Sequence, residues 1–195
     1  MTARRSTRGV ALGLAAVLLG GLLAVVPSPR PAAADGCYSW SRTLTTGRSG
    51  SDVRRLQVRV SGYPGYGRRL AIDGVYGPNT RAAVRRFQSA YGLAVDGIAG
   101  PQTLGMIERL QDDDCTPISF SYREIDEGCG GSGFSGGPIG AAATRSATLI
   151  TLWQLQALRR ALGSSPIVLS SGFRSHACNR AVGGAPRSRH LYGDS

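Results

Sequence analysis

Hydrophobic positions recur at helical spacing in four separate stretches of the chain. Three short helices are predicted: one over residues 51–60 with Ser51 as its N-cap, one over residues 78–90, and one around Leu104. Three short helices within about 60 residues predict a small helical bundle. The apolar positions that carry these predictions are Val53, Leu56, Val60, Val84, Phe87, Tyr91, Leu104, Ile107 and Leu110, with Thr80 on the same face of the second helix.

The fourth stretch predicts the longest helix, over residues 144–162. Gly163 follows it and is the expected C-terminal cap. Trp153 lies beside the apolar stripe, so we expect it in the core. The stripe itself is Leu149, Leu152, Leu155, Leu158 and Leu162.

Two other segments have the character of strands. The pattern "ISFSYRE" after residue 117 predicts a short strand or the entry to one, and Ile167–Leu169 predicts a buried strand that runs into a polar turn. Between these segments, residues 127–140 hold seven glycines and must form a loop. The fold class is therefore α+β: a small all-α three-helix bundle followed by an incomplete α+β domain.

One motif occurs twice with a period of 23 residues. "AIDGVYGPNT" at 71–80 is followed by "AVDGIAGPQT" at 94–103. In each copy Asp-Gly predicts a turn, and the proline of Gly-Pro predicts the first position of a helix. We interpret the motif as architectural rather than ligand-binding. Its residues are Asp73, Gly74, Gly77 and Pro78 in the first copy and Asp96, Gly97, Gly100 and Pro101 in the second.

The first 34 residues have the composition of an export signal. Three arginines precede an apolar run over residues 9–26, and Ala32 and Ala34 fit a signal-peptidase site. An uncleaved membrane anchor is the alternative, and the Arg4-Arg5 pair leaves open whether export uses the general or the twin-arginine route. Cleavage after Ala34 removes four arginines and no acidic residue, so the net charge falls from +11 to +7.

Four cysteines remain after cleavage: Cys37, Cys115, Cys129 and Cys178. An even number in an exported chain indicates two disulfides, whereas no C-x-x-C pair supports a zinc cluster. They can be paired in three ways. The sequential pairing, Cys37–Cys115 and Cys129–Cys178, would close two successive units separately.

Residues 47–111 resemble the peptidoglycan-binding domain of the three-helix type. The resemblance rests on "VRRLQVRV", on the paired "DGxxGPxT" motifs and on "AVRRFQSAYGL". It implies attachment to the bacterial cell wall, with peptidoglycan rather than nucleic acid as the partner of this basic protein. Tyr63, Tyr66 and Tyr76 are candidates for stacking on sugar rings, if they are exposed.

The end of the chain, "SGFRSHACNRAVGGAPRSRHLYGDS", resembles the zinc D-alanyl-D-alanine carboxypeptidase family, whose members trim wall peptides. By this resemblance Arg174 and Ser188 contact the substrate, Arg174 near its terminal carboxylate. His190 is by the same resemblance the first zinc ligand. Ser195 stands where the family usually has alanine. Asp194 is in the wrong register to replace the aspartate ligand, and nothing indicates that His176 binds zinc.

The family motif continues past Ser195, so we expect this chain to be C-terminally truncated. Its remaining zinc ligands and its catalytic acid/base are expected beyond that residue, which leaves no catalytic residue in the chain as given. Since catalytic zinc needs three protein ligands, we expect this segment to bind zinc poorly and to lack activity. A non-catalytic wall-binding protein with a decayed peptidase remnant and a wall-peptide endopeptidase are the alternatives.

These inferences together predict three parts. They are a signal peptide at 1–34, a peptidoglycan-binding domain at 35–115, and the N-terminal part of a zinc carboxypeptidase domain at 116–195. We expect a secreted, wall-associated monomer with no membrane anchor after cleavage.

Overall fold

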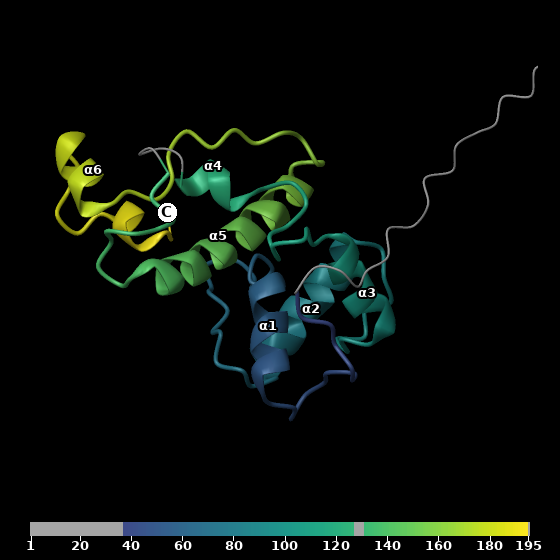
Figure 1. The fold of residues 1–195 in the computed structure, drawn as a ribbon. Coiled ribbons are helices and arrows are strands. Elements are labelled where there is room, and N and C mark those ends of the chain that lie inside the picture. The colour runs from purple at the N-terminus through teal and green to yellow at the C-terminus, as the bar shows by residue number, and fades with distance from the viewer. Residues whose placement is uncertain (1–36, 127–130, 195) are drawn as a thin grey trace, which may run out of the picture. The chain divides into compact units, whose positions relative to one another are not determined.

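The computed structural model describes residues 37–126 and 131–194, which all belong to one compact unit. The predicted signal peptide lies outside the described residues. Figure 1 shows the described chain as a succession of helices joined by long connections. The helices are α1 (Ser51–Arg59), α2 (Pro78–Ala90), α3 (Pro101–Arg109), α4 (Tyr122–Asp126), α5 (Ala141–Ala161), α6 (His176–Ala181) and the 3₁₀ helix η2 (Arg189–Tyr192).

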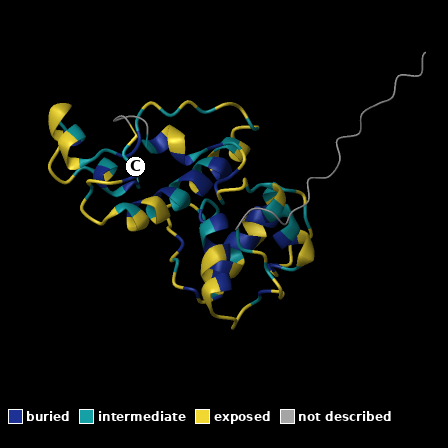
Figure 2. Cartoon of the chain, in the orientation of Figure 1, coloured by how far each residue is buried: buried dark blue, intermediate teal, exposed yellow. Residues whose placement is uncertain are grey.

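The first three helices form the predicted bundle. Each turns its apolar face inward, and Figure 2 shows the buried positions in dark blue along these faces. The bounds predicted for α2 are confirmed, whereas the N-cap of α1 is Gly50 and Ser51 is the first helical residue. The fully buried aliphatic and aromatic side chains of this core include Leu44, Val53, Leu56, Val60, Tyr76, Val84, Phe87 and Ile107.

Short backbone contacts join the connecting segments to the repeat. Leu44 and Ala99 exchange two hydrogen bonds of 3.0 and 2.9 Å, and Ser49 pairs with Val75 in a second isolated bridge. Tyr76 is fully buried, and its hydroxyl donates to the carbonyl oxygen of Gly97 at 2.9 Å. The first copy of the repeat is therefore hydrogen-bonded to the turn of the second.

Each copy of the repeat is organised around one buried glutamine. In the second copy the Gln88 side-chain nitrogen lies 2.7 Å from Asp96 Oδ1, 3.0 Å from the Ile98 carbonyl oxygen and 3.0 Å from Thr103 Oγ1. The Gln88 side-chain oxygen accepts the backbone N–H of Gly97 at 2.8 Å. The amide thus satisfies the polar groups of the turn and of the following helix at once.

The first copy repeats this arrangement with Gln57 of α1. Its amide nitrogen contacts Asp73 Oδ1 at 2.8 Å and Thr80 Oγ1 at 3.0 Å, and its oxygen accepts from the Gly74 N–H at 2.8 Å. Asp73 Oδ1 also accepts the Val75 N–H at 2.8 Å, as Asp96 does from Ile98. The architectural interpretation of both aspartates agrees with these contacts.

The two strand predictions are wrong for the described residues, whose only pairings are isolated bridges. Part of "ISFSYRE" forms the helix α4. Ile167–Leu169 is irregular: Val168 is 89% exposed, while Ile167 and Leu169 pack against a second core. The side chains alternate as in a strand, but a strand also needs a neighbouring backbone, and none of the described residues provides one. The described residues are therefore helical, and the expected α+β class is not confirmed.

The buried face of α5 also differs from the expected stripe. Leu152 is fully buried, but Leu158 and Leu162 are 48% and 56% exposed. The buried side chains are instead Thr144, Thr148, Leu152, Trp153, Gln156 and Ala157. Trp153 is in the core as predicted, packed with the bundle, whereas Leu152 belongs to the second core with Phe120, Ile125, Phe134 and Phe173. The helix ends as predicted, with Gly163 at a φ of 70°.

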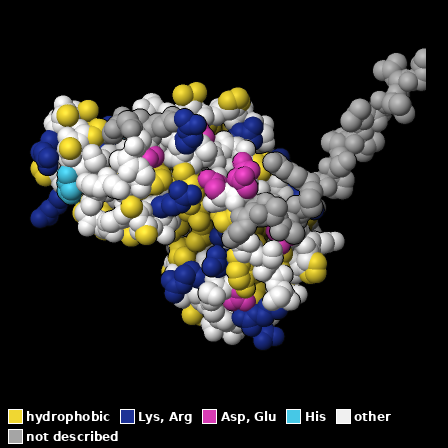
Figure 3. Space-filling model, in the orientation of Figure 1, with side chains coloured by type: hydrophobic (Ala, Val, Ile, Leu, Met, Phe, Trp, Pro, Cys, Tyr) yellow, Lys and Arg dark blue, Asp and Glu magenta, His cyan; other side chains and the backbone are white. Residues whose placement is uncertain are grey.

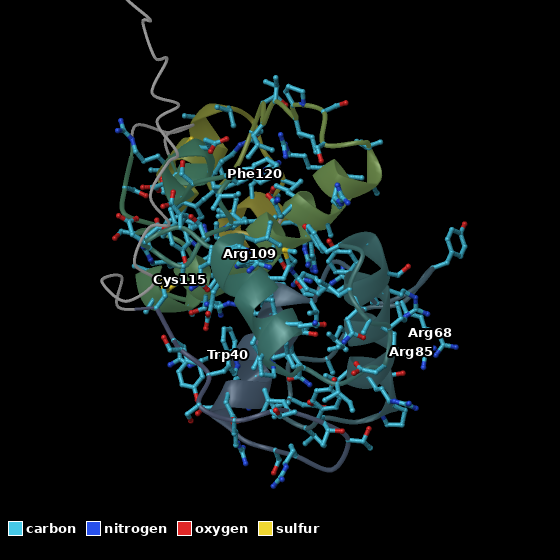
Figure 4. The ribbon with its side chains drawn as sticks, turned by 90° about the vertical axis from the view of Figure 1, so that its right-hand side faces the viewer. Trp40, Arg68, Arg85, Arg109, Cys115 and Phe120 are labelled. Carbon is cyan, nitrogen blue, oxygen red and sulfur yellow. A yellow bond between two sulfur atoms is a disulfide. The ribbon has the colours of Figure 1, made fainter. Side chains whose placement is uncertain are left out.

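A disulfide joins Cys37 to Cys115 across 78 residues of sequence, as the sequential pairing requires (Figure 4). Cys178 is also disulfide-bonded. Its pairing with Cys129 stays a prediction because Cys129 lies outside the described residues. No helix within the described ranges is long and apolar enough to cross a membrane.

Candidate functional site

The segment that carries Arg174 is fixed by close backbone contact with α4. A side chain at Gly172 would place its Cβ 2.3 Å from the carbonyl oxygen of Ile125, so only glycine fits there. The next residue, Phe173, donates its backbone N–H to the same oxygen at 2.8 Å and buries its ring in the second core. These contacts fix the position of the backbone from which the Arg174 side chain extends.

Two hydrogen bonds join this segment to His190 on η2. The backbone N–H of Arg174 donates to the carbonyl oxygen of His190 at 2.9 Å. In the other direction, His190 Nδ1 lies 2.7 Å from the carbonyl oxygen of Gly172. The structure thus brings together two of the site residues predicted from the sequence, Arg174 and His190.

The second contact determines the tautomer of His190. A carbonyl oxygen only accepts hydrogen bonds, so Nδ1 must carry the proton, and Nε2 is then the nitrogen with the lone pair in the neutral ring. Histidines that bind metals commonly donate their other N–H to a backbone carbonyl in this way. The Nδ1 contact of His190 is therefore of the kind that metal-binding histidines make.

The helix η2 is held against α5 on the other side. Leu191 is buried, and the carbonyl oxygen of Gly193 lies 3.2 Å from Thr148 Oγ1 and 3.4 Å from Thr151 Oγ1. Gly193 has a φ of 71°, and a Cβ there would lie 2.5 Å from Thr148 Oγ1. Glycine is needed at this position for both its conformation and its size.

The two predicted substrate contacts have different surroundings. Arg174 is half-buried, and its Nη2 donates to Ser171 Oγ at 2.8 Å, which restrains one side of the guanidinium. Ser188 is the N-cap residue of η2 and does not cap it with its side chain; its carbonyl oxygen accepts from the Leu191 N–H at 3.1 Å. The structure therefore gives Arg174 a defined position and gives Ser188 a backbone role.

The remaining candidate ligands are directed elsewhere. Asp194 forms an ion pair with Arg189, and His176 is exposed at the first turn of α6. Across residues 37–126 and 131–194, no three His, Cys, Asp or Glu side chains are placed to hold a metal ion together. The described residues supply one suitable imidazole and not a complete zinc site, so we derive no catalytic step through zinc.

Two residues of this arrangement were missed at the level of sequence. Gly172 and Ser171 were read only as part of a turn, yet they contact His190 and Arg174 respectively. Their position two and three residues before Arg174 is the only local signal, because the contacts join residues up to 18 positions apart.

The three candidate tyrosines of the binding unit are not equivalent. Tyr66 is fully exposed, Tyr63 is half-buried in an aromatic cluster with Phe87 and Tyr91, and Tyr76 is buried. Burial raises the pKa of the Tyr76 phenol. Tyr76 is therefore a core residue, and a role for it in sugar stacking is wrong.

Figure 3 shows arginine side chains spread over the face in view, with the few acidic side chains between them. One arginine is buried: the Arg59 guanidinium donates twice to Gln111 Oε1, at 3.1 and 2.7 Å, and lies 5.7 and 5.9 Å from the rings of Trp40 and Trp153. Burial lowers the pKa of Arg59 to about 10, so it remains charged at neutral pH.

Family comparisons assign the two halves of the chain separately. Residues 49–107 match the peptidoglycan-binding domain family, and residues 118–195 match the family called peptidase M15. The chain therefore has one segment similar to peptidoglycan-binding domains, followed by one similar to peptidase M15. The His190 and Arg174 arrangement lies within the M15 part.

A zinc D-Ala-D-Ala carboxypeptidase of Streptomyces albus G is 54% identical over 161 residues, which are 83% of this chain. The chain spans 62% of the length of that relative. The N-acetylmuramoyl-L-alanine amidase CwlA of Bacillus subtilis (strain 168) is 39% identical over 59 residues, 30% of this chain and 22% of its own length.

Among solved structures, a peptidoglycan-binding protein from Clostridioides difficile is 37% identical over 35% of this chain and 42% of its own, with a TM-score of 0.32. A fused Zn-dependent amidase/peptidase from Clostridium acetobutylicum, with a peptidoglycan-binding domain, is 31% identical over 55% of this chain and 44% of its own, also with a TM-score of 0.32. At these scores the assignment rests on the sequence matches.

Proposed function

We propose that this chain is part of a zinc D-alanyl-D-alanine carboxypeptidase. This enzyme would remove the C-terminal D-alanine from peptidoglycan peptides. Two hydrogen bonds of His190 carry the proposal: its carbonyl oxygen accepts the Arg174 N–H, and its Nδ1 contacts the Gly172 carbonyl oxygen, which fixes the tautomer of the imidazole. The 54% identity to a relative of that name supports it.

In this proposal the described residues have distinct roles. His190 offers Nε2 to the metal, while the Gly172 carbonyl oxygen holds its ring in place. The guanidinium of Arg174 binds the terminal carboxylate of the peptide, because its planar fork matches two carboxylate oxygens. Zinc, when bound, would polarise the scissile carbonyl and activate water.

We propose residues 35–115 as the unit that delivers the enzyme to the cell wall, and residues 116–195 as the beginning of the peptidase unit. Export through the signal at residues 1–34 would place the protein outside the membrane, where the disulfides persist. The matched binding family supports the role of the first unit.

The decisive experiment measures release of D-alanine from a synthetic peptide that ends in D-Ala-D-Ala. Two proteins are compared: the chain ending at Ser195, and the same chain extended by the coding sequence downstream to the length of its Streptomyces relative. We expect zinc-dependent release only from the extended protein, with stoichiometric zinc by elemental analysis.

Two substitutions in the extended protein test the residue roles. His190→Ala should remove both zinc and activity, and Arg174→Lys should raise KM more than it lowers kcat because the bidentate contact is lost. Arg180→Lys, at an exposed position of α6, is the matched control. Full activity of the His190→Ala protein, or a stop codon directly after Ser195, would refute the proposal.

A further inference from the structure

A polar pocket of about 320 Å³ lies on the peptidoglycan-binding unit, between the segment 40–43 and α3. Trp40 and Arg42 line one side, and Gly105 and Glu108 of α3 line the other. In Figure 4, Trp40 is labelled beside α3, whose last residue, Arg109, is also labelled. Of the residues that line the pocket, Pro101 also belongs to the second copy of the repeated motif, and none belongs to the candidate active site.

The aromatic and basic side of this pocket is held rigidly. Trp40 is half-buried, and its indole N–H donates to the backbone oxygen of Asp52 at 3.1 Å. Arg42 donates through Nε to the Asp52 carboxylate at 2.7 Å and through Nη2 to the Ser49 carbonyl oxygen at 3.1 Å. A ligand would therefore meet side chains whose positions are already fixed, which lowers the entropy cost of binding.

Gly105 is the residue that keeps the pocket open. It lies in the interior of α3, where glycine is less favourable than any residue except proline. Packing does not require it, because a Cβ at this position would have Arg109 Nη1, at 4.0 Å, as its nearest neighbour. Because Gly105 lines the pocket, we expect a larger residue at this position to reduce the space available to a ligand.

The charges around the pocket do not favour an acidic ligand. The guanidinium of Arg42 is already paired with the Asp52 carboxylate, and Glu108 adds a further negative charge to the lining. Wall peptides carry carboxylates, so they would gain little binding free energy in this pocket. A neutral ligand with hydroxyl and amide groups matches the Trp40 indole ring, the Glu108 carboxylate and the hydroxyls of Ser41 and Thr43. The small volume of the pocket suits a ligand with a single ring.

We propose that this pocket binds one N-acetylated hexosamine of the glycan strand, with the sugar ring against Trp40. The proposal rests on the wall-binding function proposed for this unit and names the part of peptidoglycan that it recognises. The Glu108 carboxylate accepts from sugar hydroxyls, and the absence of a side chain at Gly105 lets the ring approach the helix backbone.

Gly105→Leu and Gly105→Ala separate binding from stability. Both should leave the melting temperature of the chain unchanged or raise it, because both residues favour helix more than glycine does. Retention on insoluble purified peptidoglycan should fall roughly tenfold or more for leucine and less for alanine, since groups added to a filled pocket displace the ligand. Gln102→Leu, on an exposed part of α3 away from the pocket, is the control and should bind as the original protein does.

Each outcome of the sedimentation assay is decisive. Equal retention of the Gly105→Leu and unsubstituted proteins would overturn the pocket assignment and leave wall binding intact, whereas no retention of the unsubstituted protein would refute the proposed wall binding itself. Competition by soluble N-acetylglucosamine oligomers is expected. Competition by a synthetic stem peptide in their place would overturn the choice of a sugar as the ligand.

Discussion

The buried Gln88 amide offers the sharpest test of how the repeat holds the bundle together. Gln88→Met keeps the length and apolar contacts of the side chain but removes every hydrogen bond of the amide. The Gly97 N–H is buried and donates to the Gln88 side-chain oxygen, so it would lose its acceptor. A buried unsatisfied N–H costs about 1–3 kcal/mol, whereas the exposed Asp96 carboxylate can rebind water.

Adding the lost contacts to Ile98 and Thr103, each worth about 0.5–1.5 kcal/mol, we expect the free energy of unfolding to fall by about 2–6 kcal/mol. Urea denaturation followed by tryptophan fluorescence measures this change, because Trp153 lies in the affected core. Gln102→Met, an exposed position of α3, should change the free energy by less than about 0.5 kcal/mol. A Gln88→Met protein as stable as this control would refute the assignment.

Three further perturbations have expected outcomes. Hydrogen bonds from the backbone and from the buried glutamines lower the pKa of Asp73 and Asp96 below 3.8. Their stabilising contribution is therefore present above about pH 4 and is lost as the pH falls further. An acid titration followed by far-UV circular dichroism should show unfolding that begins below pH 4. Removal of the Cys37–Cys115 disulfide, which spans 78 residues, by the double substitution Cys37→Ser and Cys115→Ser should lower the free energy of unfolding by up to about 4 kcal/mol in urea denaturation without reductant. Denaturation curves equal to those of the unsubstituted protein would contradict this. Gly193→Ala should lower the melting temperature more than Gly183→Ala does. Both glycines have a positive φ, but only a Cβ at position 193 would contact other atoms. An equal loss of melting temperature would mean that backbone strain alone matters.

Local signals predicted the parts of the fold that depend on neighbours in sequence. Gly-Pro at residues 77–78 set the start of α2, and Gly163 set the end of α5, because both residues act through their own backbone conformation. The buried position of Trp153 and the Cys37–Cys115 pairing were also predictable. The irregular conformation of Ile167–Leu169 was not, because alternation of side chains does not show whether a second backbone lies alongside.

The sequence by itself determined the helices of the binding unit, its duplicated turn and the presence of Arg174 and His190 in a recognisable order. Only the tertiary structure decided that Gly172 orients the His190 ring, that Gln88 joins a turn to a helix, and that Gly105 opens a pocket. The physical reason is distance along the chain. Helix starts and turns are set by residues a few positions apart, whereas these contacts join segments whose meeting depends on how the whole core packs.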